Sequence, residues 1–296
     1  MQKEIKHFIL HLRLHYQFFI LSGGYLLGGL LADQMNSAQY WLQFLNVHLL
    51  LFGGATAYNS YWDKDEGPIG GLKNPPKMTR WMHPVSLAFM VAGWAWAVTI
   101  GWGYFLIFGL SLLLFWLYST PHARWKGKPI LSLAVIGIST GTNSVLLGFW
   151  AAGGVFSWPI LFGSMGAGLI LLSLYPVSQV YQSEEDEKRG DVTFFRRYGL
   201  KVVQRFFAIN FFAGMCLVSL SLFEFYRYPA IVLFILGLLT FVTLHRFVSN
   251  LKGSEIEYRD VMNIKFFASL SFVLFLLISN TIRYEWIGST FLREYF

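Results

Sequence analysis

The chain changes character at residues 59–77, which read NSYWDKDEGPIGGLKNPPK. Before this stretch the sequence is almost continuously apolar, as expected of helices that cross a lipid bilayer. Asn59, Asp63, Asp65 and Glu66 place oxygen-bearing side chains where such a helix ends, and the glycines and prolines that follow cannot continue it. We therefore expect a chemical site at the end of this helix rather than an ordinary surface loop.

The composition of the chain indicates a polytopic membrane protein. Of its 296 residues, 55% are hydrophobic and 19% aromatic, whereas only 13% are charged. Soluble domains carry roughly 25% charged residues. The net charge of +7 must be judged by where the basic residues fall, because cytoplasmic loops of membrane proteins concentrate Lys and Arg. The single cysteine, Cys216, excludes an intrachain disulfide and a Cys-rich metal site.

Nine apolar segments are predicted to be transmembrane helices, so the expected fold class is all-α, with a single membrane domain over residues 1–296. The segments are 14–31, 40–57, 84–100, 104–117, 130–152, 159–180, 206–225, 229–248 and 266–282. Residues 1–13 form a basic, amphipathic arm that should lie at the cytoplasmic interface. His7, His11 and His15 share one helix face, so a metal-binding stripe is an alternative to a simple polar face.

The positions of the basic residues predict a cytoplasmic N-terminus and a C-terminus on the opposite side. Under strict alternation of nine spans, 20 of the 23 Lys and Arg residues fall on one face, and only Arg227, Arg283 and Arg293 fall on the other. The positive charge is thus explained by topology, and we expect the lipid bilayer rather than nucleic acid as the partner. The bacterial inner membrane is the expected location.

A second acidic stretch, residues 175–193, reads YPVSQVYQSEEDEKRGDVT and follows the sixth apolar segment on the same face. Carboxylates at the mouth of a membrane helix are costly to desolvate and normally mark an ion or substrate site. Oxygen ligands without histidine or thiolate neighbours favour Mg2+, which commonly binds one or two carboxylates together with phosphate oxygens. Two such stretches facing each other would hold a diphosphate, whose remaining charge calls for cations. The candidates are Lys73, Lys77, Arg124, Lys126, Lys128, Lys188 and Arg189.

These residues resemble the signatures of the UbiA-type intramembrane prenyltransferases. Asn59 and Asp63 match the opening of the family's first signature, N-x-x-x-D-x-x-x-D, and Asp186 and Gly190 match the end of the second, D-x-x-x-D-x-x-x-G. Residues 118–126, YSTPHARWK, are similar to the family's loop between helices four and five. The resemblance covers nearly the whole chain. It implies a nine-helix bundle around a central cavity, in which Mg2+ assists transfer of a prenyl group from an allylic prenyl diphosphate to a hydrophobic acceptor, aromatic or lipid-like.

The resemblance also implies roles for individual residues. The catalytic residues are expected to be Asn59, Asp63 and Asp186. The metal ligands are expected among Asn59, Asp63, Asp65, Glu66 and Asp186. The substrate-binding residues are expected to be Lys73, Arg124, Lys126, Lys128, Asn143, Tyr175, Gln179, Gln182, Lys188 and Arg189.

Two positions depart from the family pattern. Gly67 stands where the first signature has its final Asp, so Asp65 or Glu66 would have to supply that carboxylate. Gln182 stands where the second signature begins with Asp, and the nearby Glu184 cannot point the same way because a helix turns by about 100° per residue. A separate metal geometry, or an inactive or repurposed member of the family, would account for both departures.

Several of these interpretations have alternatives. Asp63 could cap a helix end or pair with Lys64, while Glu185 and Asp191 could belong to a solvated charged face. Asn143 could serve helix packing rather than acceptor binding. The alternative functions are a UbiA-like terpene cyclase, a diphosphate hydrolase and a secondary transporter. The acids lie at one face of the membrane, whereas transporter sites usually lie near the bilayer midplane.

Overall fold

The computed structural model of the protein describes residues 2–286 and residue 288. Within these residues the chain is helical, and the only β-type pairing is a single bridge between Ile69 and Leu72. The predicted all-α fold class is confirmed.

The helical segments follow one another through short connections, apart from the longer one after α5. In chain order they are α1 (Gln2–His11), α2 (Leu14–Tyr16), η1 (Gln17–Leu21), α3 (Ser22–Leu31), α4 (Ser37–Leu45), η2 (Asn46–Gly53), α5 (Gly54–Asp63), α6 (Met82–Ala97), α7 (Trp102–Ser119), η3 (Trp125–Gly127), α8 (Pro129–Val135), η4 (Ile136–Thr142), α9 (Asn143–Ala152), α10 (Trp158–Leu174), η5 (Pro176–Gln182), α11 (Ser183–Lys188), α12 (Phe194–Tyr198), α13 (Leu200–Phe223), α14 (Arg227–Ser249), η6 (Glu255–Glu257) and α15 (Tyr258–Arg283).

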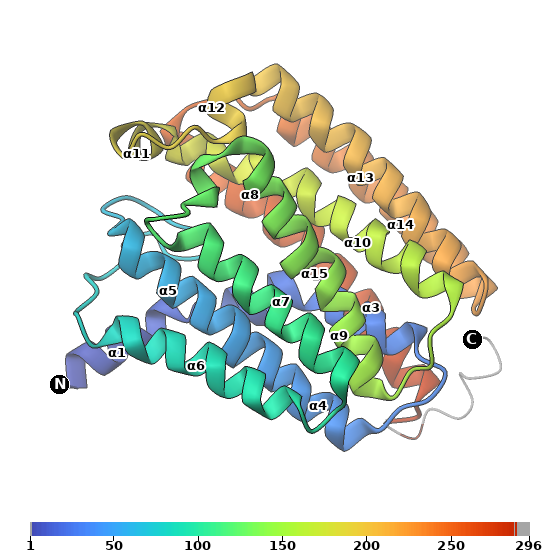
Figure 1. Ribbon diagram of the computed structural model, residues 1–296. Coiled ribbons are helices and arrows are strands. Elements are labelled where there is room, and N and C mark those ends of the chain that lie inside the picture. The colour runs from blue at the N-terminus through green and yellow to red at the C-terminus, as the bar shows by residue number, and fades with distance from the viewer. Residues whose placement is uncertain (1, 287, 289–296) are drawn as a thin grey trace.

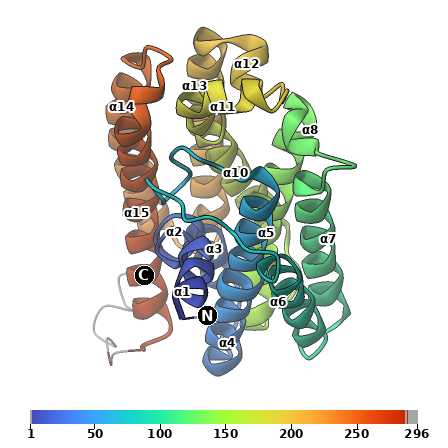
Figure 2. The ribbon, with the colours of Figure 1, turned by 90° about the vertical axis from the view of Figure 1, so that its left-hand side faces the viewer.

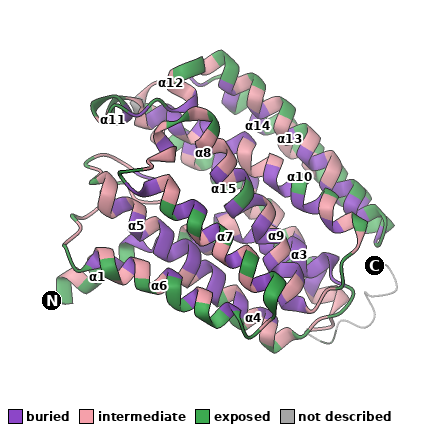
Figure 3. Ribbon diagram, in the orientation of Figure 1, coloured by how far each residue is buried: buried purple, intermediate pink, exposed green. Residues whose placement is uncertain are grey.

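The helices form one bundle (Figure 1), and the residues at its two ends differ in chemistry. The end that we call the polar end holds the last turns of α5 and α7 together with α8, α11 and α12, and it carries both acidic stretches. The connection from α5 to α6 crosses this end toward α15 (Figure 2), where the Tyr258 hydroxyl donates a hydrogen bond to the Ile69 carbonyl oxygen at 3.3 Å. Buried residues concentrate on inner helices such as α3 and α9, whereas α14 exposes most of its surface (Figure 3).

Six helices among the described residues are long and apolar enough to cross a membrane. They are Trp102–Ser119, Pro129–Ala152, Trp158–Lys188, Leu200–Phe223, Arg227–Ser249 and Tyr258–Arg283. The other three predicted spans are helical but differ in kind. Residues 14–31 and 40–57 contain π-helical turns and buried polar side chains such as Gln17 and Asn46, and α6 has 16 residues. The count of nine spans therefore stays a prediction.

Three helical stretches of the bundle contain π-helical turns. The turns η1, η2 and η4 contribute Leu21, Phe52 and Thr140 to the wall of one internal cavity. A π-helical turn inserts an extra residue, so it redirects side chains, and such turns are frequent at functional sites. The hydrophobic pattern of a regular helix does not reveal them.

The N-terminal arm is a separate helix that docks on the start of α6. Arg13 adopts the left-handed conformation, with φ of 50°, and turns the chain between α1 and α2. The Phe8 ring packs edge-on against Phe89 with 5.4 Å between centroids, and it also contacts Trp81. The arm is therefore held to the bundle by aromatic contacts.

Two of the three histidines of this region, His11 and His15, contact backbone oxygens. His11 Nε2 lies 2.7 Å from the Pro76 carbonyl oxygen, and His15 Nε2 lies 2.9 Å from the carbonyl oxygen of Gly71. Both bonds tie the connection between α5 and α6 to the start of the chain. The alternative of a metal stripe through His7, His11 and His15 has no support in this arrangement.

Helices α3 and α9 approach each other closely at Gly28 and Gly148. A Cβ atom on Gly28 would lie 2.0 Å from the Val145 carbonyl oxygen, and one on Gly148 would lie 2.0 Å from the carbonyl oxygen of Tyr25. Small residues permit this kind of backbone approach between membrane helices, where dispersion contacts replace the hydrophobic effect as the driving force. No side chain larger than hydrogen fits either position without moving a helix.

We expect Gly148→Ala to destabilise the folded protein by about 1–3 kcal/mol, because the added methyl group forces α3 away from α9. The measurement is the midpoint of thermal unfolding of the purified protein in detergent. Gly103→Ala is the matched control, since Gly103 is exposed and a Cβ there would lie no closer than 3.5 Å to Trp150. A midpoint for Gly148→Ala equal to that of the control would contradict the close approach.

Candidate functional site

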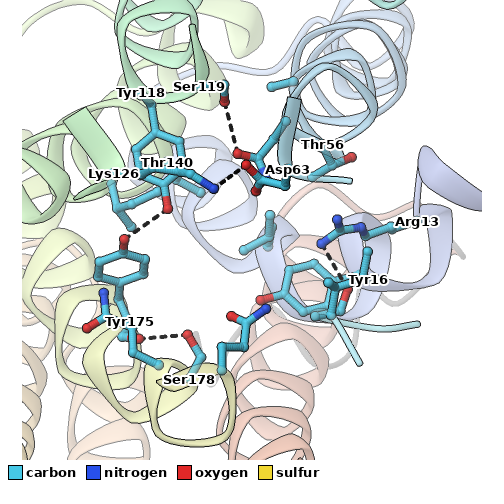
Figure 4. Close-up of a pocket in the computed structure, with 18 of the residues that line it drawn as sticks. Arg13, Tyr16, Thr56, Asp63, Tyr118, Ser119, Lys126, Thr140, Tyr175 and Ser178 are labelled. Atoms are coloured by element: carbon cyan, nitrogen blue, oxygen red, sulfur yellow. Dashed lines mark hydrogen bonds and ion pairs between the residues drawn. The ribbon is translucent and has the colours of Figure 1, made fainter. Parts of the chain in front are cut away.

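A cavity opens at the polar end of the bundle, between the two acidic stretches (Figure 4). Its polar side chains include Arg13, Tyr16, Asn59, Asp63, Asp65, Ser119, Lys126, Gln179, Gln182, Asp186, Arg189, Asp191 and Lys265. Its apolar wall includes Ile20, Leu21, Phe52, Phe115, Ile136, Leu171 and Leu174. The prediction that the two acidic stretches face each other is confirmed.

Helix α5 presents Asn59 and Asp63 to this cavity, because residues four apart share a helix face. The Asn59 amide donates a hydrogen bond from Nδ2 to Asp63 Oδ2 at 2.8 Å, and Ser119 Oγ donates to Asn59 Oδ1 at 3.0 Å. The helix ends at Lys64, whose φ of 52° is left-handed. This turn brings Asp65 back to the cavity, where its side chain is only 3% exposed.

The second acidic stretch reaches the cavity through a change of helix type. Helix α10 continues into the 3-10 helix η5 and then into α11. A 3-10 helix has three residues per turn, so the residues beyond it leave the face that a continuous α-helix would give them. Asp186 of α11 is buried and lines the cavity together with Gln179 and Gln182 of η5. The Gln179 side chain is itself held, because its Oε1 accepts a hydrogen bond from the Phe195 amide at 3.0 Å.

Cations from other segments hold the carboxylates of the first stretch. Lys126 Nζ pairs with Asp63 Oδ1, and Figure 4 shows the two side chains directed toward each other. Arg189 Nη2 pairs with Asp65 Oδ1 at 2.7 Å. The partly buried ion pairs thus join the first acidic stretch to the connection before α8 and to the end of α11.

Asp191 lies in the cavity wall, not on the solvated face that the sequence suggested. Its side chain is 3% exposed, and its two oxygens accept hydrogen bonds from Arg124 Nε and Nη2 at 2.7 and 2.9 Å. Its Oδ2 also lies 3.8 Å from Lys126 Nζ. Asp191 and Asp63 therefore hold Lys126 between them, and Arg124 fixes the orientation of Asp191.

Glu185 joins the two acidic stretches directly. Its Oε1 accepts hydrogen bonds from the backbone amides of Glu66 and Gly67 at 3.2 and 2.6 Å, and its Oε2 pairs with Arg189 at 3.2 Å. A Cβ atom on Gly67 would lie 2.9 Å from Glu185 Oε1. The glutamate therefore occupies the space beside position 67, which corrects its assignment to a solvated face.

Burial and neighbouring charges act together on the ionisation of Asp65. Burial raises the pKa of Asp65 to about 6, and the nearby Asp63 carboxylate adds to the increase, while Arg189 and Lys126 act in the opposite direction. Burial disfavours the charged form of a carboxylate, and an additional positive charge beside Asp63 and Asp65 would favour it.

The candidate metal-donor atoms in the cavity are oxygens of Asn59, Asp63, Asp65 and Asp186. Within the described part of the chain, no three His, Cys, Asp or Glu side chains lie close enough together to hold a metal ion. Ion pairs to Lys126 and other cations hold these acids instead. The oxygen-only donor set nevertheless fits a hard divalent cation such as Mg2+.

Two tyrosines cross the cavity next to these acids. The hydroxyl groups of Tyr118 and Tyr175 lie 2.9 Å apart and share a hydrogen bond, as Figure 4 shows. Tyr175 was predicted from its place before the second acidic stretch, and it does line the cavity. The same cavity is lined by apolar side chains such as Phe115, Ile136 and Leu171.

Some predicted residues lie outside the cavity wall. The exposed ones are Glu66, Lys73, Lys128 and Lys188. Asn143 is buried between α9 and α7, where its Nδ2 donates a hydrogen bond to Ser111 Oγ at 2.9 Å. Arg124 reaches the cavity only through Asp191. The binding roles of these residues stay predictions.

Other cavity residues escaped the sequence interpretation. Arg13, Tyr16 and Lys265 line the wall but belong to no recognisable motif. Arg13 and Lys265 each stand where a predicted span begins on the cytoplasmic side. Membrane topology alone predicts a basic residue at such a place, so the sequence could not distinguish a residue of the cavity wall from one that only marks the cytoplasmic side.

Comparison with solved structures gives similarity along nearly the whole chain. A UbiA homologue from Archaeoglobus fulgidus bound to DMAPP and Mg2+ matches with a TM-score of 0.73 at 15% identity, covering 93% of this chain and 99% of that chain. Its complex with GPP and Mg2+ matches with the same TM-score of 0.73 and 15% identity, again covering 93% of this chain and 99% of that chain. A structure of digeranylgeranylglyceryl phosphate synthase matches with a TM-score of 0.67 at 17% identity, covering 94% and 99%. At these identities the similarity shows a shared fold. Comparison with curated proteins gave no match.

The family comparison adds a direct match in sequence. Residues 21–270 match the UbiA prenyltransferase family. This range includes both acidic stretches, the connection that carries Lys126, and most of the helices that surround the cavity. The chain therefore belongs to the UbiA prenyltransferase family.

Proposed function

We propose that this protein transfers a prenyl group from an allylic prenyl diphosphate to a hydrophobic acceptor, with Mg2+ bound between the two acidic stretches. The observation that carries the proposal is the meeting of Asp63, Asp65 and Asp186 with Lys126 and Arg189 at the mouth of an apolar cavity. The Archaeoglobus fulgidus homologue bound to DMAPP or GPP together with Mg2+ supports the same donor class here.

Asn59, Asp63, Asp65 and Asp186 are the residues that would hold Mg2+. When bound there, Mg2+ neutralises part of the negative charge that grows on the diphosphate as it leaves. The departures at Gly67 and Gln182 do not empty the site of carboxylates, because Asp65 and Asp186 remain buried beside Asp63.

The cations of the cavity supply the remaining neutralisation. Lys126 and Arg189 bind phosphate oxygens and stabilise them as the bond from carbon to oxygen breaks and its electron pair stays with the diphosphate. Asp191 and Arg124 are positioning residues, since they hold Lys126 at the cavity wall.

The apolar wall takes the prenyl group. Phe52 and Phe115, with Tyr118 and Tyr175 at the polar boundary, place aromatic rings where positive charge develops on the prenyl carbon. The same wall excludes water, which would otherwise capture the carbocation and give hydrolysis.

Family membership and the six apolar helices make this a membrane protein. We further propose that it is one domain in which residues 14–31, 37–63 and 82–97 complete nine spans. The polar end and the N-terminus then face the cytoplasm of a bacterium, and the C-terminus lies on the other side of the inner membrane. Arg293, which entered the charge count for that side, lies outside the described residues.

We expect Asp63→Asn combined with Asp186→Asn to weaken Mg2+-dependent binding of a non-hydrolysable prenyl thiodiphosphate by at least about a hundredfold, because two charged contacts are lost. Isothermal titration calorimetry of the purified protein, with and without Mg2+, measures the affinity. Glu187→Gln is the matched control, since the Glu187 side chain is 72% exposed and pairs with Arg196. Unchanged affinity in the double variant, or binding by the wild type that needs no Mg2+, would refute the proposed site.

We expect Glu185→Ala to loosen the connection between α5 and α6, because the Glu66 and Gly67 amides lose their acceptor. Limited proteolysis with trypsin should then cleave after the exposed Lys73 and Lys77 at least about tenfold faster, since hydrogen bonds to charged groups contribute about 1.5–3 kcal/mol each. Glu187→Ala serves as the control for loss of an acid in α11. Cleavage at the wild-type rate would show that Glu185 does not hold this connection.

A further inference from the structure

Three exposed cations near the start of α13 take no part in the diphosphate site described above. Arg197 lies in α12, and Lys201 and Arg205 lie in the first turns of α13. None of the ion pairs formed within 4.0 Å among the described residues involves these three side chains. Arg196 differs from them, because its Nη2 lies 3.2 Å from Glu187 Oε1.

The sequence around these cations supplies no acid to balance them. Residues 192–223 contain four basic side chains and no Asp or Glu. In residues 184–191, by contrast, acidic and basic side chains are mixed, and several of them pair with one another or with the first acidic stretch. Membrane topology accounts for basic residues at the polar end, but it does not account for the absence of acids beside them. The start of α13 is therefore a region of uncompensated positive charge.

Two of the cations continue into an apolar face of the same helix. Lys201 and Arg205 are followed at helical spacing by Ile209 and Phe212, so the four side chains share one face of α13. Ile209 is 68% exposed and Phe212 is 43% exposed. A helix rises 1.5 Å per residue, so Phe212 lies roughly 10 Å from Arg205 along the axis. This face changes from charged to apolar over about the distance that separates a phospholipid headgroup from its acyl chains.

Helix α14 forms the other side of this surface. Gln204 Nε2 donates a hydrogen bond to the Val248 carbonyl oxygen at 3.0 Å, which holds the end of α14 beside the first turns of α13. The Phe241 ring lies 5.8 Å from the Phe212 ring, and it stacks on the exposed His245 with 5.7 Å between centroids. We call this surface the α13–α14 seam; it consists of Lys201, Arg205, Ile209, Phe212, Phe241 and His245.

The chemistry of the seam identifies its ligand. A soluble anion would contact only the cations and leave the apolar part of the seam without a partner. A lipid with a neutral headgroup would contact the apolar part and leave the positive charge unbalanced. Clusters of Lys and Arg at the cytoplasmic end of a membrane helix attract anionic lipids. A molecule that carries both a negative headgroup and long hydrocarbon chains matches both parts of the seam.

We infer that the α13–α14 seam binds an anionic phospholipid of the membrane. Lys201 and Arg205 contact the phosphate of its headgroup, and an acyl chain lies along Ile209, Phe212 and Phe241. Helix α14 exposes most of its own surface (Figure 3), so a lipid that contacts α13 and α14 together stabilises their packing. The lipid takes no part in prenyl transfer, and the inference does not depend on that reaction.

The test compares two phospholipids that have the same chains and different headgroup charge, dioleoylphosphatidylglycerol and dioleoylphosphatidylcholine. Each is titrated into the full-length protein in detergent, and native mass spectrometry counts the bound lipids. We expect the first lipid molecule to bind about tenfold more tightly when it is the anionic one, because two cations contact its headgroup. Glycerol 3-phosphate, which has the phosphate without the chains, should bind at least about a hundredfold more weakly than the anionic lipid.

The variants assign that preference to the seam. Lys201→Gln combined with Arg205→Gln should bring the ratio of the two lipid affinities close to one, whereas Lys201→Arg combined with Arg205→Lys should preserve it. Lys3→Gln combined with Lys6→Gln is the matched control, since it removes two exposed lysines of α1. Without lipid, all variants should unfold at the wild-type temperature, because the substituted side chains are exposed. Dioleoylphosphatidylglycerol should then raise the midpoint of the wild type and the control, but not that of the Gln variant of the seam.

Three outcomes would overturn the inference: equal affinity of the wild type for the two lipids, a preference that survives the Gln variant of the seam, or a preference that the Lys3 and Lys6 control loses to the same extent. The last result would show a general attraction of positive charge to anionic lipid instead of a site. Glycerol 3-phosphate binding as tightly as the lipid would assign Lys201 and Arg205 to a soluble anion. Neither Mg2+ nor a prenyl diphosphate is present in these titrations, so their failure leaves the proposed function untouched.

Discussion

Carboxylates at the end of an apolar helix can be buried only if cations are brought to them, because neither the helix nor the lipid offers compensation. In this protein the cations come from distant parts of the chain. Lys126 is 63 residues from Asp63, and Arg189 is 124 residues from Asp65. Each pair therefore closes a long loop, and the polar end can form only when several helices are already in place. The same ion pairs therefore stabilise the polar end and fix the geometry of its site.

The cavity is lined both by charged side chains, whose acids and bases nearly balance, and by aromatic and aliphatic side chains. Part of the apolar wall comes from the π-helical turns η1, η2 and η4. Each turn redirects side chains while the helix continues. A reactive carbocation requires this combination, since its leaving group needs charge and the cation itself needs a dry environment.

The all-helical membrane fold could be predicted from the sequence because long apolar segments have few alternatives in a bilayer. Asp63 could be placed because it follows Asn59 by one helical turn, and that local spacing survives in the structure. Residues whose role depends on tertiary structure could not be placed. In sequence Asp191 resembles its charged neighbours, and only the fold shows that its side chain is buried. Lys265 contacts Tyr16 of α2, which is 249 residues away along the chain. The 3-10 turn before Asp186 likewise depends on packing.

The contact between Gly67 and Glu185 also links the sequence at two distant positions. Because a Cβ at position 67 would lie 2.9 Å from Glu185 Oε1, a side chain there would displace the end of the flexible glutamate from the Glu66 and Gly67 amides. A shorter residue at 185 would leave that space open. Related sequences should therefore accept a side chain at 67 most readily where residue 185 is shorter than glutamate.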